Sequence, residues 1–268
     1  QIYTSDKIKY KPIVTPNEQG RYDDIKEQVQ HLEFFLQLLF RKEKFRPGQT
    51  PILSRALQNK SVIGLLPTGG GKSLTYQIAV LLQPGIALII DPIKSLMKDK
   101  YEGLRKANIA SCSYINSDDI AESRENKLKL MEQSMLQFVF LSPERFSIYD
   151  FRQRLKNMYE TGVYFSYGII DEVHCVLEWG HDFRTTYLHL GRNLYNYVLP
   201  KDGHISLFGL TATASFDVLA DIERELSGDG AFPMDADVIV RYEYTNRAEL
   251  QYKIVKIEGI PETRWPWN

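Results

Sequence analysis

The sequence has little cysteine, no long hydrophobic run and almost no net charge. Cys112 and Cys175 are the only cysteines among 268 residues; they are too few for a disulfide framework and too far apart for a C-x-x-C metal or redox motif. The longest apolar stretch, residues 85–90, is far shorter than the ~20 residues of a membrane-spanning helix. With 33 basic and 34 acidic residues the net charge is −1, so bulk charge indicates neither a nucleic-acid nor a membrane partner. A nucleic-acid site, if present, has to be local.

The rest of the composition is typical of a globular protein. Hydrophobic residues make up 43% and charged residues 25%, with 17 Gly and 12 Pro, which excludes collagen-like, coiled-coil and wholly disordered chains. The length allows one large or two small domains. The chain opens at Gln1 without a charged-then-apolar leader, so we expect an excised or processed piece from a reducing, cytoplasmic compartment rather than a secreted protein.

Short apolar runs alternate with helical stretches along most of the chain. Apolar residues recur every three or four positions from residue 25 to 40, which predicts an amphipathic helix. Beyond it we expect strands at residues 61–66, 85–90, 111–115, 137–141, 167–170, 205–210 and 236–240, and helices at residues 73–82, 94–107, 121–135, 151–159, 184–197 and 216–226. This alternation indicates a doubly wound α/β domain, with a mostly parallel sheet and helices on both faces. Ligands of such sheets bind at the carboxyl ends of the strands.

The first of these strands ends in a loop with the spacing of a phosphate-binding loop, although Leu66 stands where the general pattern has its first Gly. The loop and the start of the helix consist of Thr68, Gly69, Gly70, Gly71, Lys72 and Ser73. Glycines let backbone N–H groups turn toward phosphate oxygens, Lys72 reaches the β and γ phosphates, and Ser73 holds Mg²⁺. The alternative is a glycine-rich turn before an ordinary helix, which this residue order makes rare.

A second strand delivers two carboxylates at its end. Asp171 is placed to bind Mg²⁺ directly or through water, and Glu172 to orient and deprotonate an attacking water. The alternative is a solvated acidic strand end. An intact Glu172 favours hydrolysis over nucleotide binding alone.

Two further segments gain weight from their place in this order. Thr211 and Thr213 follow another strand, where small hydroxyl residues would lie close to a γ-phosphate. Upstream of the phosphate loop, residues 45–49 end in Gln49, whose amide offers the donor and acceptor that pair with an adenine edge. Taken alone, either segment is an ordinary turn or helix start.

A short loop after the carboxylates combines aromatic and basic residues. Trp179, His181, Phe183 and Arg184 suit stacking and phosphate contact with single-stranded nucleic acid; the alternative is a structural loop with Trp179 and Phe183 packed inward. Lys94, Lys98, Lys100 and Arg145 are further candidates for backbone phosphates. For the lysines a solvated helix face is the stronger alternative.

These five segments, in this order, resemble the first motor domain of superfamily 2 helicases, and in detail the RecQ family. The resemblance implies a RecA-like domain that uses ATP and Mg²⁺ in an ATP-dependent 3′-to-5′ DNA helicase of repair or recombination. It implies catalysis by Lys72, Asp171 and Glu172, metal binding by Ser73 and Asp171, nucleotide binding by Arg46, Gln49, Thr68 and the phosphate loop, coupling by His174, Thr211 and Thr213, and DNA binding by Lys94, Arg145, Trp179, His181, Phe183 and Arg184.

The same resemblance divides the chain. We expect an extended arm at residues 1–24, the ATP-binding domain at 25–243 and, from 244 to 268, the start of a linker to a second motor domain of the same longer chain. The partners implied are single-stranded or partly duplex DNA and that second domain. No membrane is expected, the fragment is expected to be a monomer, and the location is cytoplasmic or nucleoid-associated, or nuclear in a eukaryote. Without the second domain's arginine finger, hydrolysis by this chain alone is expected to be feeble.

Three residues depart from the family pattern, and two of them, Lys42 and Glu178, support an alternative. Val173 replaces the usual Ala, Lys42 stands where relatives stack adenine on an aromatic ring, and Glu178 adds a negative charge to the aromatic loop. The alternative function is an ATP-dependent switch or scaffold in a larger DNA-associated assembly, with no unwinding. The effect of single-stranded DNA on the ATPase rate separates the two.

Overall fold

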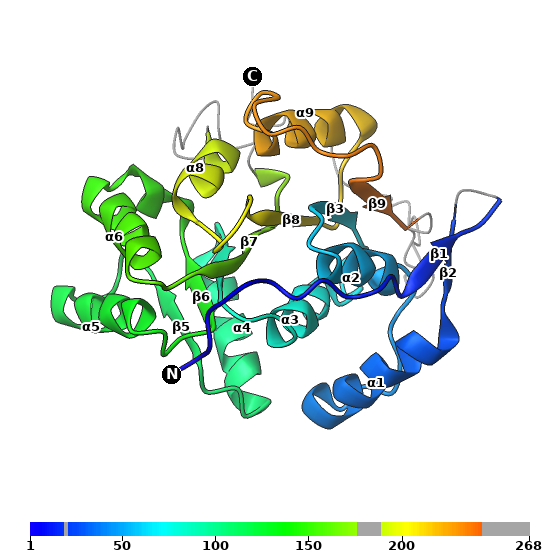
Figure 1. Ribbon diagram of the computed structural model, residues 1–268, viewed down its shortest axis with the longest axis horizontal. Coiled ribbons are helices and arrows are strands. Elements are labelled where there is room, and N and C mark those ends of the chain that lie inside the picture. The colour runs from blue at the N-terminus through cyan, green and yellow to red at the C-terminus, as the bar shows by residue number, and fades with distance from the viewer. Residues whose placement is uncertain (19–20, 176–188, 243–268) are drawn as a thin grey trace, which may run out of the picture.

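A seven-stranded sheet forms the centre of the structure (Figure 1), a computed structural model that describes residues 1–18, 21–175 and 189–242. The strands lie in the order β5-β6-β4-β7-β8-β3-β9, and each neighbouring pair is parallel. Their bounds are β3 Val62–Leu65, β4 Ile86–Ile90, β5 Cys112–Ile115, β6 Phe138–Leu141, β7 Phe165–Asp171, β8 Ser206–Thr211 and β9 Ile239–Arg241. The predicted α/β fold with a parallel sheet is confirmed.

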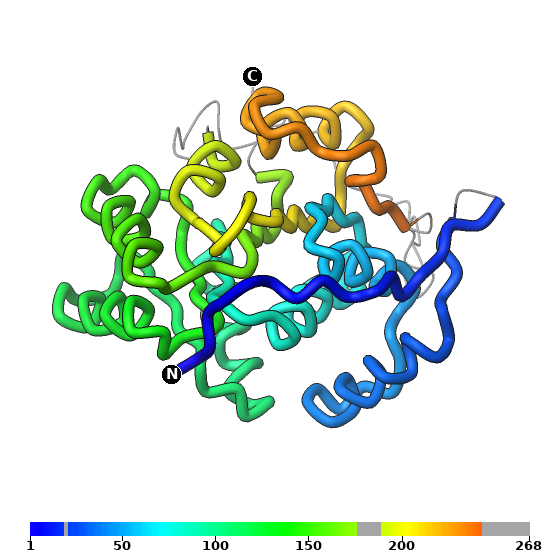
Figure 2. The backbone as a smooth tube through the Cα atoms, viewed as in Figure 1, coloured from blue at the N-terminus to red at the C-terminus, as the bar shows by residue number. Residues whose placement is uncertain are grey.

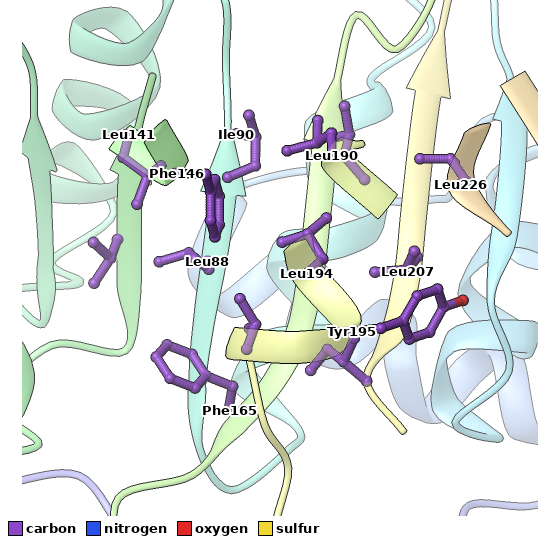
Figure 3. Packing of buried hydrophobic residues seen from close by; sticks show 14 of the residues in the cluster. Leu88, Ile90, Leu141, Phe146, Phe165, Leu190, Leu194, Tyr195, Leu207 and Leu226 are labelled. Atoms are coloured by element: carbon purple, nitrogen blue, oxygen red, sulfur yellow. The ribbon is translucent and has the colours of Figure 1, made fainter. Parts of the chain in front are cut away.

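Helices cover both faces because the buried strands are apolar at successive positions. Along β4, Leu88 and Ile90 face one hydrophobic cluster, while Ala87 and Ile89 face the other, as the two-residue period of a strand requires. Figure 3 shows the first cluster from close by, with Leu194 among its labelled side chains. Residues of α5 Ala121–Glu132, α6 Tyr149–Glu160, α8 Leu190–Tyr197 and α9 Phe216–Leu226 belong to that cluster; α1 Lys26–Phe40, α2 Gln49–Leu57, α3 Lys72–Leu81 and α4 Lys94–Lys106 contribute to the other.

Most predicted elements agree with the structure to within a few residues, and three were not predicted. The helix α2 is buried at every one of its nine positions. Ile52, Leu53, Ala56 and Leu57 recur in it at helical spacing, but nine residues are fewer than the window in which such a period is assessed. A short 3₁₀ helix, η1 Pro143–Ser147, follows β6. The third is an antiparallel hairpin of β1 Val14–Pro16 and β2 Tyr22–Asp24 within the predicted arm. Of the helix predicted at 184–197, the described part begins at Leu190.

The N-terminal segment runs across the amino ends of the strands before it reaches the hairpin (Figure 2). The carbonyl oxygen of Tyr3 accepts from the N–H of Gly85 just before β4, at 2.9 Å, and Lys7 Nζ donates to Ser206 Oγ at the start of β8, at 3.0 Å. Tyr10 N–H donates to the carbonyl of Leu57 at 3.0 Å. The arm therefore packs on the opposite edge of the sheet from the strand ends that carry the candidate site.

None of the described helices combines the length and the apolar character needed to cross a membrane. What positions the site is the order of the central strands. Because β3 pairs with β8, β8 with β7 and β7 with β4, the residues that follow these four strands meet at one edge of the sheet.

Candidate active site

The phosphate loop connects β3 to α3. Gly71 caps the helix in the left-handed region with φ of 76°, and Gly69 has φ of 77°, conformations that residues with a Cβ adopt only with strain. The N–H of Gly70 donates to the carbonyl of Pro67 at 2.8 Å. No side chain caps the start of α3, so its first N–H groups remain available for phosphate oxygens.

Lys72 and Glu172 form an ion pair across this edge. Lys72 Nζ lies 2.9 Å from Glu172 Oε1, and the two side chains are 12% and 22% exposed. Glu172 has a left-handed backbone, φ 50°, which is held by the N–H of Cys175 donating to its carbonyl at 2.9 Å. The structure thus brings together the predicted phosphate-binding lysine and the predicted general base.

Asp171 is almost fully buried at the end of β7, with 3% of its side chain exposed. Its Oδ1 accepts from the N–H of Glu172 at 3.0 Å, and its Oδ2 lies 2.8 Å from Lys100 Nζ. The same ammonium contacts the carboxylate of Asp91, which is fully buried at the end of the neighbouring strand β4. Lys100 is therefore part of the site's interior and does not share the exposed face of Lys94 and Lys98.

The electrostatics of this buried cluster follow from burial and charge together. Burial raises the pKa of the Asp91 carboxyl, and the Lys100 ammonium opposes the rise. For Lys100 burial lowers the pKa, but the charges of Asp171 and Asp91 outweigh it and the net shift is upward. Tyr76 on α3 is completely buried, so its pKa is raised well above the usual value, and the two carboxylates add to the rise. Its hydroxyl is therefore neutral.

The predicted coupling residues form one hydrogen-bonded chain. His174 Nδ1 lies 2.9 Å from Thr211 Oγ1 and 3.5 Å from Glu172 Oε2. The hydroxyl of Thr211, a fully buried residue, donates to the carbonyl of Thr213 at 3.0 Å. The end of β8 is thereby linked through His174 to the predicted base. Val173 is buried beside Gly209: a Cβ atom added to that glycine would lie 3.4 Å from Val173 Cγ2. The two methyl groups that Val173 has in place of the usual Ala side chain are therefore packed in the core.

Gln49 is bonded to the phosphate loop. Its Nε2 donates to the carbonyl oxygens of Gly70 and Gly71 at 3.0 and 2.9 Å, and its Oε1 accepts from the N–H of Arg46 at 2.7 Å. The Arg46 guanidinium donates to the carbonyl of Gly69. The side-chain amide that was predicted to contact adenine therefore also binds the backbone of the phosphate loop.

A cavity of about 660 Å³ lies beside this contact. The hairpin contributes Arg21, Tyr22 and Asp23, the segment before α2 contributes Phe45 and Arg46, and the end of β9 closes the third side. Asp24 fixes the hairpin there by accepting from the Thr50 hydroxyl at 2.6 Å. Lys42 is exposed and does not line the cavity.

The predicted DNA-contacting residues lie in different surroundings. Lys94 is exposed and pairs with Asp118 at 2.7 Å. Arg145 is 8% exposed and donates to the carbonyl of Asn116 at 3.2 Å; burial lowers its pKa, as does nearby Arg124. Trp179, His181, Phe183 and Arg184 are outside the described residues. The contacts of all six with DNA stay predictions, and Arg145 would have to leave its carbonyl partner to make one.

The family of the chain is decided by a comparison with family models. The model described as DEAD/DEAH box helicase matches residues 46–222. The chain belongs to the DEAD/DEAH box helicase family. The match begins at Arg46 and takes in the phosphate loop, both carboxylates and the threonines after β8, so every site residue predicted from the sequence lies within it.

Individual relatives of this helicase domain narrow the family. It is 34% identical over 228 residues to the ATP-dependent DNA helicase Q-like 4B of Arabidopsis thaliana, with 85% of this chain and 19% of the relative covered. Identity to the ATP-dependent DNA helicase Q1 of Rattus norvegicus is 34% over 231 residues, with 85% and 34% covered. These relatives are RecQ-family helicases, so the resemblance drawn from the motifs is confirmed. The helicase domain spans about a third of their length or less.

Solved structures agree on the fold. The Mycobacterium smegmatis helicase Lhr bound to ssDNA and AMP-PNP superposes with a TM-score of 0.60 at 21% identity, covering 80% of this chain and 28% of that one. This similarity confirms the RecA-like architecture of the helicase domain.

The donor set of the helicase domain fits Mg²⁺. Ser73 lies in the first turn of α3 and Asp171 ends β7, which gives a hydroxyl and a carboxylate. Mg²⁺ prefers oxygen ligands and is usually held by one or two protein groups together with phosphates and waters. Among the residues that the structure describes, no group of three or more His, Cys, Asp or Glu side chains is arranged to hold a metal. A cation here would depend on the phosphates of the nucleotide.

Two features of the site were missed. Asp91 ends an apolar strand in the same way as Asp171, so the rule that pointed to Asp171 also applied to it. Tyr22 lies in a segment without a period, and its place beside Arg46 depends on tertiary packing that no local pattern reveals.

Proposed function

We propose that the chain is the first motor domain of a RecQ-like ATP-dependent DNA helicase, which couples ATP hydrolysis to 3′-to-5′ movement on single-stranded DNA. The observation that carries the proposal is that Lys72, Glu172 and Asp171 meet at one edge of the sheet. Lys72 pairs with Glu172 at 2.9 Å, Asp171 accepts from the N–H of Glu172 at 3.0 Å, and Asp171 lies 2.8 Å from Lys100. A second motor domain in the same longer chain would complete the ATP site, and DNA, single-stranded or partly duplex, would be the partner.

The groups of this chain divide the chemistry between them. Lys72 would turn from Glu172 to the β and γ phosphates, with the N–H groups at the start of α3 on the same oxygens. Glu172, freed from Lys72, would orient the attacking water and accept its proton. Its left-handed backbone and its contact with His174 fix the carboxylate at the sheet edge.

Ser73 and Asp171 would hold Mg²⁺, which neutralises charge that develops on the phosphates. Asp171 is suited to this because Lys100 and the Glu172 N–H fix both its oxygens, while lone pairs on these oxygens remain for a metal or its waters.

The adenine base would lie in the cavity between the hairpin and residues 45–48. Tyr22 supplies a ring for stacking there, and Arg46 joins the cavity to the phosphate loop. Gln49 would exchange its loop carbonyls for the base edge. Such an exchange would couple occupation of the base site to opening of the loop.

The chain from Glu172 through His174 to Thr211 and Thr213 would report the state of the phosphates. The imidazole of His174 lies 3.5 Å from the base carboxylate and 2.9 Å from the Thr211 hydroxyl, so a movement of the carboxylate would be passed to Thr211. Thr213 is exposed at the end of β8, where a second domain would find it.

The test is ATP hydrolysis by the full-length protein, with and without single-stranded DNA. The proposal expects DNA to stimulate turnover and Glu172→Gln to abolish it while ATP binding is retained. Glu160→Gln, the same change at an exposed position at the end of α6, is the control. ATP binding without any DNA effect on turnover would instead support the switch or scaffold, and normal turnover in Glu172→Gln would refute Glu172 as the base.

A further inference from the structure

A lysine separates two buried carboxylates beside the nucleotide site. Asp91 and Asp171 end the paired strands β4 and β7, and their side chains are 0% and 3% exposed. Lys100, 16% exposed, reaches in from α4 and contacts both, at 2.8 Å from Asp171 Oδ2. Asp91 is also anchored by the N–H of Ile93, which donates to its Oδ1 at 3.0 Å.

Charge explains why the lysine is needed when no nucleotide is bound. Two carboxylates buried side by side repel each other when both are charged. With Lys100 between them the cluster carries one negative charge instead of two. Tyr76 also faces the pair, and its hydroxyl is neutral, so it adds no charge to this sum.

The same ammonium acts on any cation that approaches Asp171. A divalent ion without nucleotide meets the positive charge of Lys100 at the carboxylate it would bind. With a nucleotide bound, the negative charges of its phosphates would offset that repulsion. The lysine therefore penalises the metal alone far more than the metal–nucleotide complex.

We propose that Lys100 is a positioning residue of the ATP site: it holds Asp171 oriented beside Asp91 and makes the divalent cation enter with the nucleotide rather than before it. The inference rests on the proposed function, because it takes Asp171 as a metal-binding group.

The experiment measures binding of Mn²⁺, by electron paramagnetic resonance, to the folded 268-residue chain without nucleotide and with a non-hydrolysable ATP analogue. Lys100→Met is expected to bind Mn²⁺ alone roughly tenfold more tightly than the wild type or more, an effect of one unit of log affinity. Lys100→Arg, which keeps the charge, is expected to resemble the wild type. Lys98→Met, which removes an exposed lysine from the same helix, is the matched control and should also resemble it.

A second readout is thermal unfolding. Lys100→Met should melt at a lower temperature than the wild type, and MgCl₂ alone should raise that temperature, while the wild type and Lys98→Met respond little. A merely structural lysine would lower the melting temperature without any gain in metal response.

If Lys100→Met does not fold, Asp91→Asn/Lys100→Met is measured in its place, because it removes the repelling partner together with the lysine. It should bind Mn²⁺ alone more tightly than the wild type does. Affinity for Mn²⁺ equal to that of the wild type in whichever of the two folds overturns the inference.

Asp171→Asn separates this inference from the proposed function. It should lose Mn²⁺ binding in the presence of the nucleotide analogue, and combined with Lys100→Met it should lose the gain for Mn²⁺ alone. If Asp171→Asn retains nucleotide-dependent Mn²⁺ binding, the proposed metal role fails. If it loses that binding while Lys100→Met matches the wild type, only the role of Lys100 fails.

Discussion

Replacing Glu172 by Gln should strengthen nucleotide binding as well as stop hydrolysis. Glu172 Oε1 lies 2.9 Å from Lys72 Nζ, and phosphates would recruit that lysine only by breaking the pair. Gln has nearly the same shape as Glu and is no more strained than Glu at the left-handed backbone of this position. It lacks the negative charge that would compete with phosphate for Lys72.

The size of the gain follows from the exposure of the pair. The side chains are 12% and 22% exposed, between a surface pair, worth about 0.2–1 kcal/mol, and a fully buried one. An attraction of about 0.5–1.5 kcal/mol lost from the empty state corresponds to roughly 2- to 10-fold tighter nucleotide binding. Loss of the general base should lower turnover about 10²–10⁴-fold.

The assay is a titration of the chain with a fluorescent ATP analogue at two salt concentrations. The wild type and Glu172→Gln should converge at high salt, because salt screens the partly exposed pair. Glu102→Gln, which removes an exposed glutamate on α4, is the control. Weaker nucleotide binding by a folded Glu172→Gln would show that Glu172 supports the bound nucleotide, and it would refute competition for Lys72.

Four further predictions test other parts of the structure. Gly71→Ala places a Cβ 2.5 Å from Gln49 Nε2 at a φ of 76°, so it should cost about 1–3 kcal/mol in urea unfolding and abolish nucleotide binding; retention of both would contradict the loop geometry. Tyr22→Ala should weaken binding of ATP roughly tenfold, the effect of about 1.4 kcal/mol of lost stacking, and weaken inorganic triphosphate much less; equal losses would place the base elsewhere. Asp91→Asn and Lys100→Met should each destabilise the fold by about 3–5 kcal/mol and together by less than their sum, whereas additive losses would deny their contact. Burial raises the pKa of the Cys112 thiol to about 11, so at pH 8 the neutral thiol dominates, and in Cys175→Ser its reaction with a disulfide reagent should be about 100-fold slower than that of a free thiol or more, rising with pH toward that pKa; a rate like that of free cysteine would contradict its burial.

Strand positions and the phosphate loop were predictable because their signals are local. The strand β4 is apolar at all five positions, and a glycine run before Lys72 has few other uses. The helix α2 was missed although Ile52, Leu53, Ala56 and Leu57 recur in it at helical spacing, because its nine residues are fewer than the window in which a helical period is assessed.

Lys100, which the sequence analysis grouped with Lys94 and Lys98, shows how far a local pattern can place a side chain. Lys94 and Lys98 are four residues apart and share one face of α4, whereas Lys100 shares the other face with the buried Met97 and Leu104. Two carboxylates, from the ends of β4 and β7, hold Lys100 in the interior. Its partner Asp171 lies 71 positions away, and only the pairing of the two strands brings Asp91 beside it. Likewise, the contact of Gln49 with the phosphate loop depends on how α2 packs against α3, which neither segment encodes alone.

Each of the two carboxylates that would act on ATP is paired with a lysine in the empty site, but the two lysines differ in their fate. Lys72 belongs to the loop that is proposed to bind the phosphates, so binding of a nucleotide would take it from Glu172. Lys100 comes from α4 and remains anchored by Asp91, so Asp171 keeps its partner. On this arrangement the base becomes free only after phosphates have taken its lysine, while the metal-binding carboxylate stays fixed throughout. A water-activating group that is released by its own substrate is inactive whenever the site is empty.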